Sequence, residues 1–132
     1  EIITPDNLPL NDNRFQIDLD NKTITTKSSY IKFDFKNESG WTFYTGPFCI
    51  FETGSDCTFN TGSNCIFNTG SYCTFKTGSN CFFYTGSNCF FYTGSDCGFN
   101  TDSDCIFDTG LRCKFETGPD CEFNTGLDRK FN

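Results

Sequence analysis

Histidine and methionine are absent from the 132 residues, and the chain contains one tryptophan and four prolines. Without histidine, a serine or cysteine nucleophile lacks its commonest general base, and no CxxC pair is present to build a compact metal site. Ten basic residues are scattered among 17 acidic ones, for a net charge of −7, so we expect no nucleic-acid partner. No apolar run of membrane length occurs, so we expect no membrane partner.

Hydrophobic residues make up only 36% of the chain, and most of the 18% that are aromatic are phenylalanine. This proportion is low for an ordinary single-domain globule but sufficient for a thin core that is two side chains wide. Because the chain starts at Glu1 and has no methionine, we expect a processed chain or a fragment of a longer protein. Its localisation stays unknown for the same reason.

One octapeptide recurs without a break from Thr45 to Asn132, in eleven copies such as Thr-Gly-Ser-Asn-Cys-Ile-Phe-Asn. Threonine opens every copy, phenylalanine holds the seventh position, and cysteine holds the fifth until Arg129 replaces it. A repeat of this kind cannot bury its apolar face alone and gains stability by stacking on its neighbours. We therefore expect a repeat domain over residues 45–132 and an atypical N-terminal cap over residues 1–44.

Each octapeptide is interpreted as one short strand and one tight turn. The period of two in Cys-x-Phe places Cys and Phe on one face of the strand and their neighbours on the other. In the turn Thr-Gly-Ser, glycine is expected at the third position of a type II turn, which requires a positive φ. Asp102 replaces this glycine once, and aspartate tolerates that conformation better than most residues.

Either two or three such octads can close one coil. We favour two, because the strands of a flat coil run in opposite directions, so that a small Cys would face a large Phe. Asp96 and Arg112 would then stack with opposite charges, whereas Glu52 and Lys76 would pair in a triangular coil of three octads. The predicted fold is thus all-β, a β-solenoid (parallel β-helix) of octapeptide repeats with two repeats per coil, and the triangular alternative stays open.

In a coil of two octads, the inward positions form continuous columns along the rod, with adjacent coils ~4.8 Å apart. The predicted structural core contains two columns of cysteine: Cys49, Cys65, Cys81, Cys97 and Cys113 in one, and Cys57, Cys73, Cys89, Cys105 and Cys121 in the other. It also contains the phenylalanines of the seventh position: Phe51, Phe59, Phe67, Phe75, Phe83, Phe91, Phe99, Phe107, Phe115, Phe123 and Phe131.

The first part of the chain is less regular. Residues 1–13 are predicted to be an irregular lead, because Pro5, Pro9 and three asparagines in close succession oppose a regular element. Residues 15–19 alternate apolar and polar side chains, residues 20–22 suit a turn, and residues 23–26 suit a second strand. We therefore expect a hairpin that begins the stack.

We expect the eight-residue spacing to begin at Ser29, before the strict repeat starts at Thr45. Phe33 and Phe35 would then hold the Cys and Phe positions of one degenerate copy, and Trp41 and Phe43 those of the next. These large side chains predict a wider first coil. Terminal repeats are commonly atypical, because an exposed end leaves both a core and a strand edge uncovered.

The ten evenly spaced cysteines allow three interpretations. Reduced thiols that pack as small apolar residues are favoured, because free cysteine is readily buried. Neighbours in a column would have Cα atoms ~4.8 Å apart, which suits a disulfide, but five cysteines per column cannot all pair. Binding of soft metal ions is the third interpretation. The favoured interpretation involves no metal and no cofactor.

Only the middle of the repeat breaks the polar exterior. Phe82, Tyr84, Phe90 and Tyr92 lie in outward or corner positions of two successive copies, and on opposite sheets if two octads close the coil. Such side chains can form a contact surface for a protein or a glycan. Charges near the C-terminal end, at Lys114, Glu122 and Lys130, discourage edge pairing, but the chain stops in mid-coil without a separate cap. We therefore expect either a longer protein or self-association or end-to-end docking through the C-terminal coil. The carboxylates sit at repeated exposed positions rather than as a unique pair, so we expect no catalytic residues and no enzyme.

The motif TGSxCxF, repeated from Thr45 to Asn132, resembles the octapeptide-repeat proteins of mimivirus-like giant DNA viruses. This resemblance implies a β-solenoid and a viral origin, and hence a place in the virion or the host cytoplasm. It implies no activity, because the family has no catalytic residues to transfer.

The sequence therefore favours a structural or interaction protein, a rigid rod that forms part of a viral particle, fibre or assembly. One alternative is an ice-binding solenoid with a regular threonine face, although aromatic and charged residues interrupt the outward position between Cys and Phe. The other alternative is a thiol-based metal or redox store.

Overall fold

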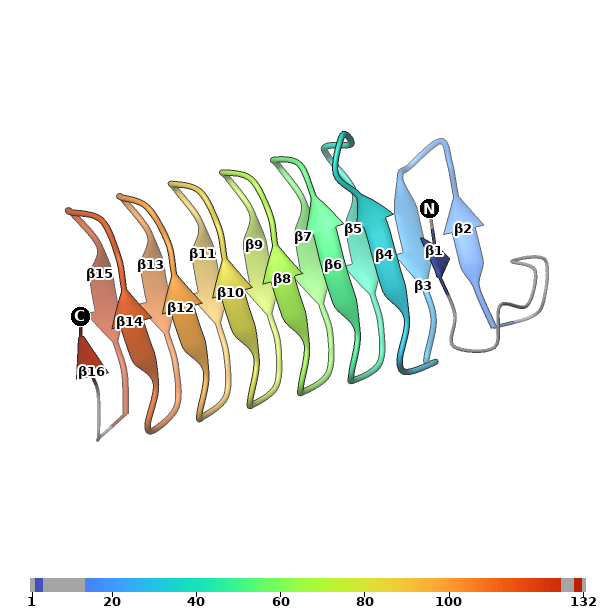
Figure 1. Cartoon of the computed structure of the whole chain (residues 1–132). Coiled ribbons are helices and arrows are strands. Elements are labelled where there is room, and N and C mark those ends of the chain that lie inside the picture. The colour runs from blue at the N-terminus through green and yellow to red at the C-terminus, as the bar shows by residue number, and fades with distance from the viewer. Residues whose placement is uncertain (1, 4–13, 127–129, 132) are drawn as a thin grey trace.

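The computed structural model describes residues 2–3, 14–126 and 130–131 of the chain. These residues form an elongated stack of flattened coils, and no helix occurs among them (Figure 1). Each coil of the repeat contributes one strand to each of two facing sheets. The structure confirms the predicted all-β parallel β-solenoid.

The strands of the first sheet, called sheet A, follow the order β1 (Ile2–Ile3), β4 (Lys32–Phe35), β6 (Ile50–Thr53), β8 (Ile66–Asn68), β10 (Phe82–Tyr84), β12 (Gly98–Asn100), β14 (Lys114–Glu116) and β16 (Lys130–Phe131). Those of sheet B follow the order β2 (Gln16–Asp18), β3 (Thr23–Thr25), β5 (Thr42–Tyr44), β7 (Thr58–Asn60), β9 (Thr74–Lys76), β11 (Phe90–Tyr92), β13 (Ile106–Asp108) and β15 (Glu122–Asn124).

The register of the parallel strands fixes the size of the coil. In sheet A, Phe67 pairs with Phe51 on one side and with Phe83 on the other, so each residue lies beside its counterpart two octads away. Sheet B keeps the same register, for example between Phe75 and Phe91. Two octapeptides per coil are confirmed, and the triangular coil of three octads is excluded.

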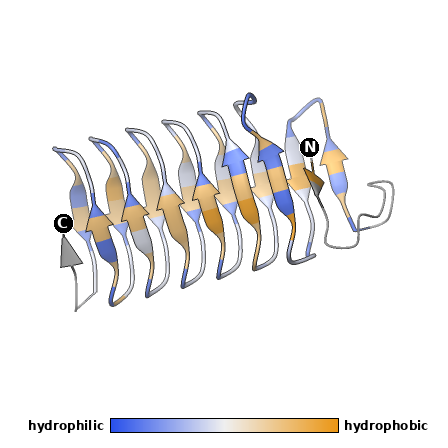
Figure 2. Cartoon of the chain, viewed as in Figure 1, coloured by the Kyte–Doolittle hydropathy of each residue, from blue (hydrophilic) through white to orange (hydrophobic). Residues whose placement is uncertain are grey.

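The phenylalanines of the seventh position fill the centre of the rod, where Figure 2 shows an apolar band across the strands. Within sheet A, the ring centroids of Phe67 and Phe83 lie 4.8 Å apart, with planes inclined by 2°. Between the sheets, Phe75 meets Phe83 edge to face at 5.1 Å and 78°. The expectation that Cys faces Phe across the core is wrong: Phe faces Phe, because a ring edge is attracted to a ring face.

The coils are related by translation with little rotation. From Phe51 to Phe115, successive rings in the sheet A stack are inclined by only 2° to 4°. Most sheets twist, and flat sheets are usually stabilised by stacking or by ladders of identical side chains. The phenylalanine stacks supply such ladders, and the rows of outward side chains are straight as a result.

The corner of each coil turns through the fourth octad position, not through glycine. Asn64 and Asn88 have φ angles of 61° and 60°, and Tyr72 and Arg112 adopt 59° and 56° at the same position. Asn and Asp, which are common there, tolerate this left-handed conformation best among residues with a Cβ. The predicted type II turn with a positive φ at glycine is therefore wrong.

Glycine is needed at the second octad position for space. A Cβ atom on Gly94 would lie 3.0 Å from the backbone nitrogen of Ser79 and 3.2 Å from the carbonyl carbon of Gly78. The Gly94 N–H donates to the Gly78 carbonyl at 3.3 Å, so the backbones of neighbouring coils meet directly here. The next residue continues the stack, because the Ser95 N–H donates to the Ser79 hydroxyl at 2.9 Å.

The predicted hairpin is confirmed, since β2 and β3 pair antiparallel. The parallel stack then begins with the pairing of β3 with β5. Part of the expected irregular lead is in fact a strand, because Ile2 and Ile3 pair antiparallel with β4. The remainder of the lead, residues 4–13, lies outside the described residues.

The predicted octad spacing before residue 37 is wrong. Phe33 pairs with Phe51 and so holds the Phe position, while Phe35 pairs with Thr53. Ile31 holds the Cys position, since its carbonyl accepts from the first residue of β6.

The next copy is as predicted. Phe43 pairs with Phe59 and holds the Phe position, and Trp41 holds the Cys position. Phe43 follows Phe33 by more than one octad, and this wider first coil accommodates the buried indole of Trp41.

Candidate functional site

The outer face of sheet A, from β4 to β14, carries two straight rows of side chains. The first row consists of Lys32, Ile50, Ile66, Phe82, Gly98 and Lys114. The second row consists of Asp34, Glu52, Asn68, Tyr84, Asn100 and Glu116. Both rows contain one residue from each of six successive strands.

The first row has an apolar centre between positive ends. Ile50, Ile66 and Phe82 are 41%, 42% and 52% exposed and lie in three successive coils. Lys32 precedes them, and Lys114 follows beyond Gly98. A contiguous group of large exposed apolar side chains, unlike isolated ones, commonly marks a contact site.

The second row has an aromatic centre between negative ends. Tyr84 is 52% exposed and lies on the same strand as Phe82. Asp34 and Glu52 form one end of the row, where the Lys36 ammonium lies 3.8 and 3.6 Å from their carboxylates, and Glu116 forms the other end. The Glu52 carboxylate lies 3.9 Å from the Lys32 ammonium, so the two rows already attract each other within the chain.

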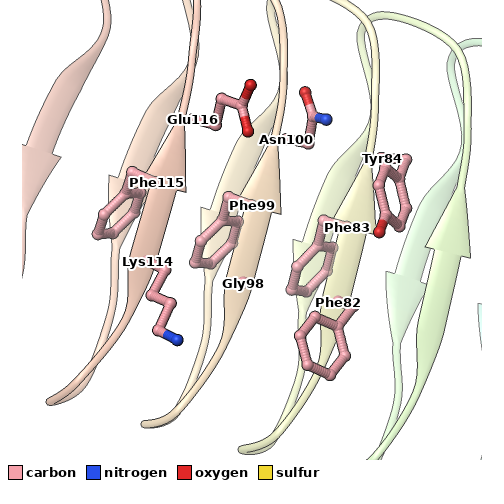
Figure 3. Close-up of a pocket in the computed structure, with 9 residues that line it drawn as sticks. All are labelled: Phe82, Phe83, Tyr84, Gly98, Phe99, Asn100, Lys114, Phe115 and Glu116. Atoms are coloured by element: carbon pink, nitrogen blue, oxygen red, sulfur yellow. The ribbon is translucent and has the colours of Figure 1, made fainter. Parts of the chain in front are cut away.

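A shallow hollow of about 180 Å³ interrupts the first row at Gly98 (Figure 3). Phe82 and Lys114 border it along the first row, and Tyr84 and Asn100 lie along the second (Figure 3). The Phe82 ring leans over Gly98, because a Cβ atom there would lie 2.8 Å from its Cδ1 atom. The hollow is open to solvent and suits a side chain from a partner better than an enclosed substrate.

The aromatic residues singled out from the sequence are all exposed, but they do not form one surface. Phe82 and Tyr84 lie on sheet A, whereas Phe90 and Tyr92, 43% and 55% exposed, lie on sheet B. This separation follows from the coil of two octads. Sequence reasoning missed the isoleucines and the opposite charges of the sheet A rows, although aligning every second octad would have brought them together.

The threonine that opens each octad is not available as a surface lattice. Thr53 and Thr61 are 7% and 9% exposed. Their hydroxyl groups lie 3.1 and 3.3 Å from the carbonyl oxygen of the following glycine and donate to it. On the outer face of sheet B, Thr58 and Thr74 are exposed in successive coils, but Phe90 ends their row. The observed threonines thus serve mainly the corners of the coil.

The cysteines line the two corners of the rod. All ten are free thiols, nine of them buried and Cys121 half-buried. The sulfur of Cys81 lies 3.6 Å from the Ser79 carbonyl oxygen and 3.7 Å from that of Gly78, close enough for weak S–H hydrogen bonds. It also lies 3.5 Å from the backbone nitrogen of Cys65 in the neighbouring coil.

Neighbouring thiols influence one another along each column. Contact with the Cys97 thiol and burial raise the pKa of Cys113. The same contact lowers the pKa of Cys97, whose sulfur accepts from its neighbours. The loss of the thiol protons from both Cys97 and Cys113 is therefore unfavourable, because the second deprotonation would place two thiolates side by side. Within the part of the chain that the structure describes, no three His, Cys, Asp or Glu side chains gather in a group able to hold a metal ion.

Most of the predicted core is buried. The seventh-position phenylalanines from Phe51 to Phe115 are at most 4% exposed, and Phe123 is half-buried. The predicted docking surface at the C-terminal coil falls partly on Arg129 and on the side chain of Phe131, which lie outside the described residues.

Comparison of the chain with protein-family models, with curated proteins and with solved structures found no significant match. Among the residues that the structure describes, no helix has the length and apolar character needed to cross a membrane.

Proposed function

We propose that this protein is a structural and interaction protein, a rigid β-solenoid rod that forms part of a viral particle, a fibre or another assembly. The main support is that every constant octad position has a folding role. Threonine binds the corner carbonyl, glycine permits close approach of the coils, serine links successive corners, and Cys and Phe fill the interior. The variable sixth and eighth positions point outward and are free to define contacts.

Rigidity is supported by the packing. Each coil is joined to the next by parallel strand pairs on both sheets and by rings stacked at 4.8 Å. Such a rod resists bending, because a bend would break aromatic contacts and backbone hydrogen bonds at the same time on its outer side. A stiff rod with a patterned surface suits a spacer or a lattice component.

The two alternatives have less support. Ice binding requires a regular exposed lattice, whereas the constant threonines are mostly buried at the corners. A thiol store requires accessible sulfur, whereas Cys81 and Cys105 are fully buried. Thermal hysteresis and titration of native thiols test these alternatives directly, and we expect no hysteresis and reaction of most thiols only after unfolding.

Mass spectrometry of purified particles and fibres from the organism that encodes the chain tests the proposed role. A structural component is expected at a fixed ratio to the major shell or fibre protein through successive purification steps. If the protein were lost during purification, or were recovered only with soluble enzymes, the structural assignment would be overturned. Small-angle scattering of the isolated protein should also give the profile of a straight rod.

A further inference from the structure

We infer that the outer face of sheet A is a self-association surface, which binds the same face of a second copy of this chain with the two rods side by side and parallel. This inference rests on the proposed function as a rod within an assembly, and it specifies both the partner and the face that the partner contacts. The observations that support it are the order of charges in the two rows, the straightness of the rows, and the hollow at Gly98.

The symmetry of the contact follows from the shape of the rod. A two-fold axis parallel to the rod, lying between two facing copies of sheet A, keeps each coil level with the same coil of the second copy. The axis exchanges left and right across the face. Consequently the first row of one copy meets the second row of the other.

This exchange brings unlike charges together at both ends of the face. Lys32 meets Asp34 of the second copy, and Lys114 meets Glu116 of the second copy. In the middle, Phe82 meets Tyr84 of the second copy, and aromatic pairs are favourable in stacked or edge-to-face geometry. Each contact occurs twice by symmetry. Ile50 and Ile66 lie opposite Glu52 and Asn68 of the second copy. The face is therefore complementary to itself in charge at its two ends and in aromatic contact at Phe82 and Tyr84, but not along the isoleucines.

The antiparallel arrangement lacks this complementarity of charge, although it would bring Ile66 opposite Phe82. With the axis perpendicular to the rods, each row meets itself in reverse order, so Lys32 would face Lys114. In the second row, Asp34 would face Glu116. Like charges placed together in this way select against a wrong arrangement, so the charge pattern specifies parallel rods.

The geometry of the face allows these contacts to form together. Because stacked phenylalanine rings of successive coils are inclined by only 2° to 4° from β6 to β14, and by 7° between β4 and β6, the rows of two copies stay nearly aligned along the face. A twisted sheet would lose contact after a few strands. The hollow at Gly98 falls opposite Asn100 of the second copy and has room for its side chain.

Sheet B does not have the same property. Under the same operation, Lys76 would face Thr74 of the second copy, Asp108 would face Ile106, and Glu122 would face Asn124, so none of these charges gains an opposite partner. Sheet B therefore provides matched control positions with the same local structure.

The contact should be weak for an isolated pair. Six strands at ~4.8 Å spacing and about 10 Å of strand length give on the order of 300 Å² per copy, which is below the usual size of a stable interface. A dissociation constant between about 10 µM and about 1 mM is expected for such a contact. Association of this strength becomes significant where many rods are held close together, as in an assembly.

Sedimentation velocity over a concentration series up to about 1 mM tests the inference. The parent protein is expected to show a reversible dimer that weakens with added salt. Lys114→Glu and Glu116→Lys should each raise the dissociation constant about tenfold, since each places like charges together twice. The double variant Lys114→Glu/Glu116→Lys should return to within about threefold of the parent, because it restores both pairs with reversed signs.

Two matched controls separate this face from general effects of charge and hydrophobicity. Lys76→Glu on sheet B makes the same change in net charge as Lys114→Glu and should leave the dimer unchanged. Phe82→Ser should weaken the dimer, whereas Phe90→Ser should not. Far-ultraviolet circular dichroism confirms that each variant is folded, and the charge variants, all at exposed positions, test the inference even if Phe82→Ser unfolds.

Three outcomes would overturn the inference. A protein that stays monomeric at every concentration has no such surface, yet its scattering as a straight rod and its presence in particles would leave the proposed function intact. A dimer affected equally by sheet A and sheet B variants uses another face. A dimer strengthened by Lys114→Glu is antiparallel, because that change would remove the repulsion from Lys32.

Discussion

Arg112 forms a bidentate hydrogen bond with Asp96 of the neighbouring coil. The Nε and Nη2 atoms of Arg112 donate to Oδ1 and Oδ2 of Asp96 at 2.9 and 3.0 Å. The two residues are separated by two octads and occupy the same corner position. Paired donors of this kind match the planar geometry of a carboxylate. Their proximity directly reflects the length of the coil.

This contact predicts a titration. Hydrogen bonds from Arg112 lower the pKa of the Asp96 carboxyl, since they favour its charged form. In the variant Arg112→Gln, the pKa of Asp96 should rise toward its ordinary value. Carbon-detected NMR of the carboxyl group measures both values. Asp56, at the equivalent octad position of another coil, serves as the control, and a coil of a different length would leave Asp96 unaffected by the substitution.

Removal of one central ring should be severe. Phe83→Ala is expected to lower the free energy of unfolding by about 3–5 kcal/mol, because Phe83 touches four other rings and its neighbours are fixed by their own stacks. Urea unfolding measures this loss. Tyr84→Ala, one residue away on the exposed face, should change stability far less.

The cysteines provide a graded comparison in the same coil. Cys81→Ala should cost much less than Phe83→Ala, because only one sulfur atom is lost from the interior. Cys81→Ser should be worse than Cys81→Ala, because the carbonyl oxygens around the sulfur lie 3.6 to 3.8 Å away, which suits sulfur but leaves a buried hydroxyl group without a hydrogen bond of normal length. A Cys81→Ala variant that unfolded as readily as Phe83→Ala would contradict the packing role of cysteine.

The corner geometry makes glycine and asparagine behave in opposite ways. Gly94→Ala should destabilise the protein by about 1–3 kcal/mol, because the added Cβ meets the backbone of the neighbouring coil. Asn88→Gly should have little effect, since glycine readily adopts its φ of 60°. Tyr72→Asn should be stabilising, by up to about 1 kcal/mol, because asparagine tolerates this conformation better than tyrosine. Thermal and urea unfolding of the three variants provide the measurement; a stabilised Gly94→Ala would refute the close approach.

Alkaline pH should weaken the fold. Contact with Cys97 and burial raise the pKa of Cys113 in the folded state, whereas unfolded thiols titrate at about pH 8.5. Above that pH the unfolded state loses a proton that the folded state keeps, so stability is complete below it and falls as pH rises. The urea midpoint should therefore decrease above about pH 8.5, and by less in Cys113→Ala. An equal decrease in both proteins would assign the effect to other groups.

Much of the fold could be predicted because the repeat is regular. The period of two in Cys-x-Phe identified the inward face. The coil length was predicted correctly from a wrong contact, Cys facing Phe across the core, because the charges barely distinguished the alternatives: Asp96 and Arg112 favoured two octads, whereas the stacking of Lys114 on Lys130 opposed them. The turn could not be derived correctly, because glycine is used both for positive φ and for close contact between backbones, and a sequence does not separate these causes. The Asn or Asp before most of the cysteines was the missed signal.

Degenerate parts were harder to predict. From the sequence, either Phe33 or Phe35 could hold the Phe position of the octad. The wider turn after β4 determines that Phe33 pairs with Phe51 and joins the aromatic stack. The candidate surface depends on residues two octads apart, such as Ile50 and Ile66, whose proximity follows only once the register is known. The order of charges along the candidate surface arises only when the coils stack, and no local sequence motif contains it.

The coil of two octads also constrains how the gene can change in length. Loss or gain of two octads together, as occurs when tandem repeats recombine out of step, would shorten or lengthen the rod and leave every later residue on its own side. Loss of a single octad would instead transfer all later residues to the opposite sheet, so that Lys114 and Glu116 would exchange sides with their counterparts on β15. Lengths that differ by even numbers of octads are therefore interchangeable in an ordered array, and odd changes are not.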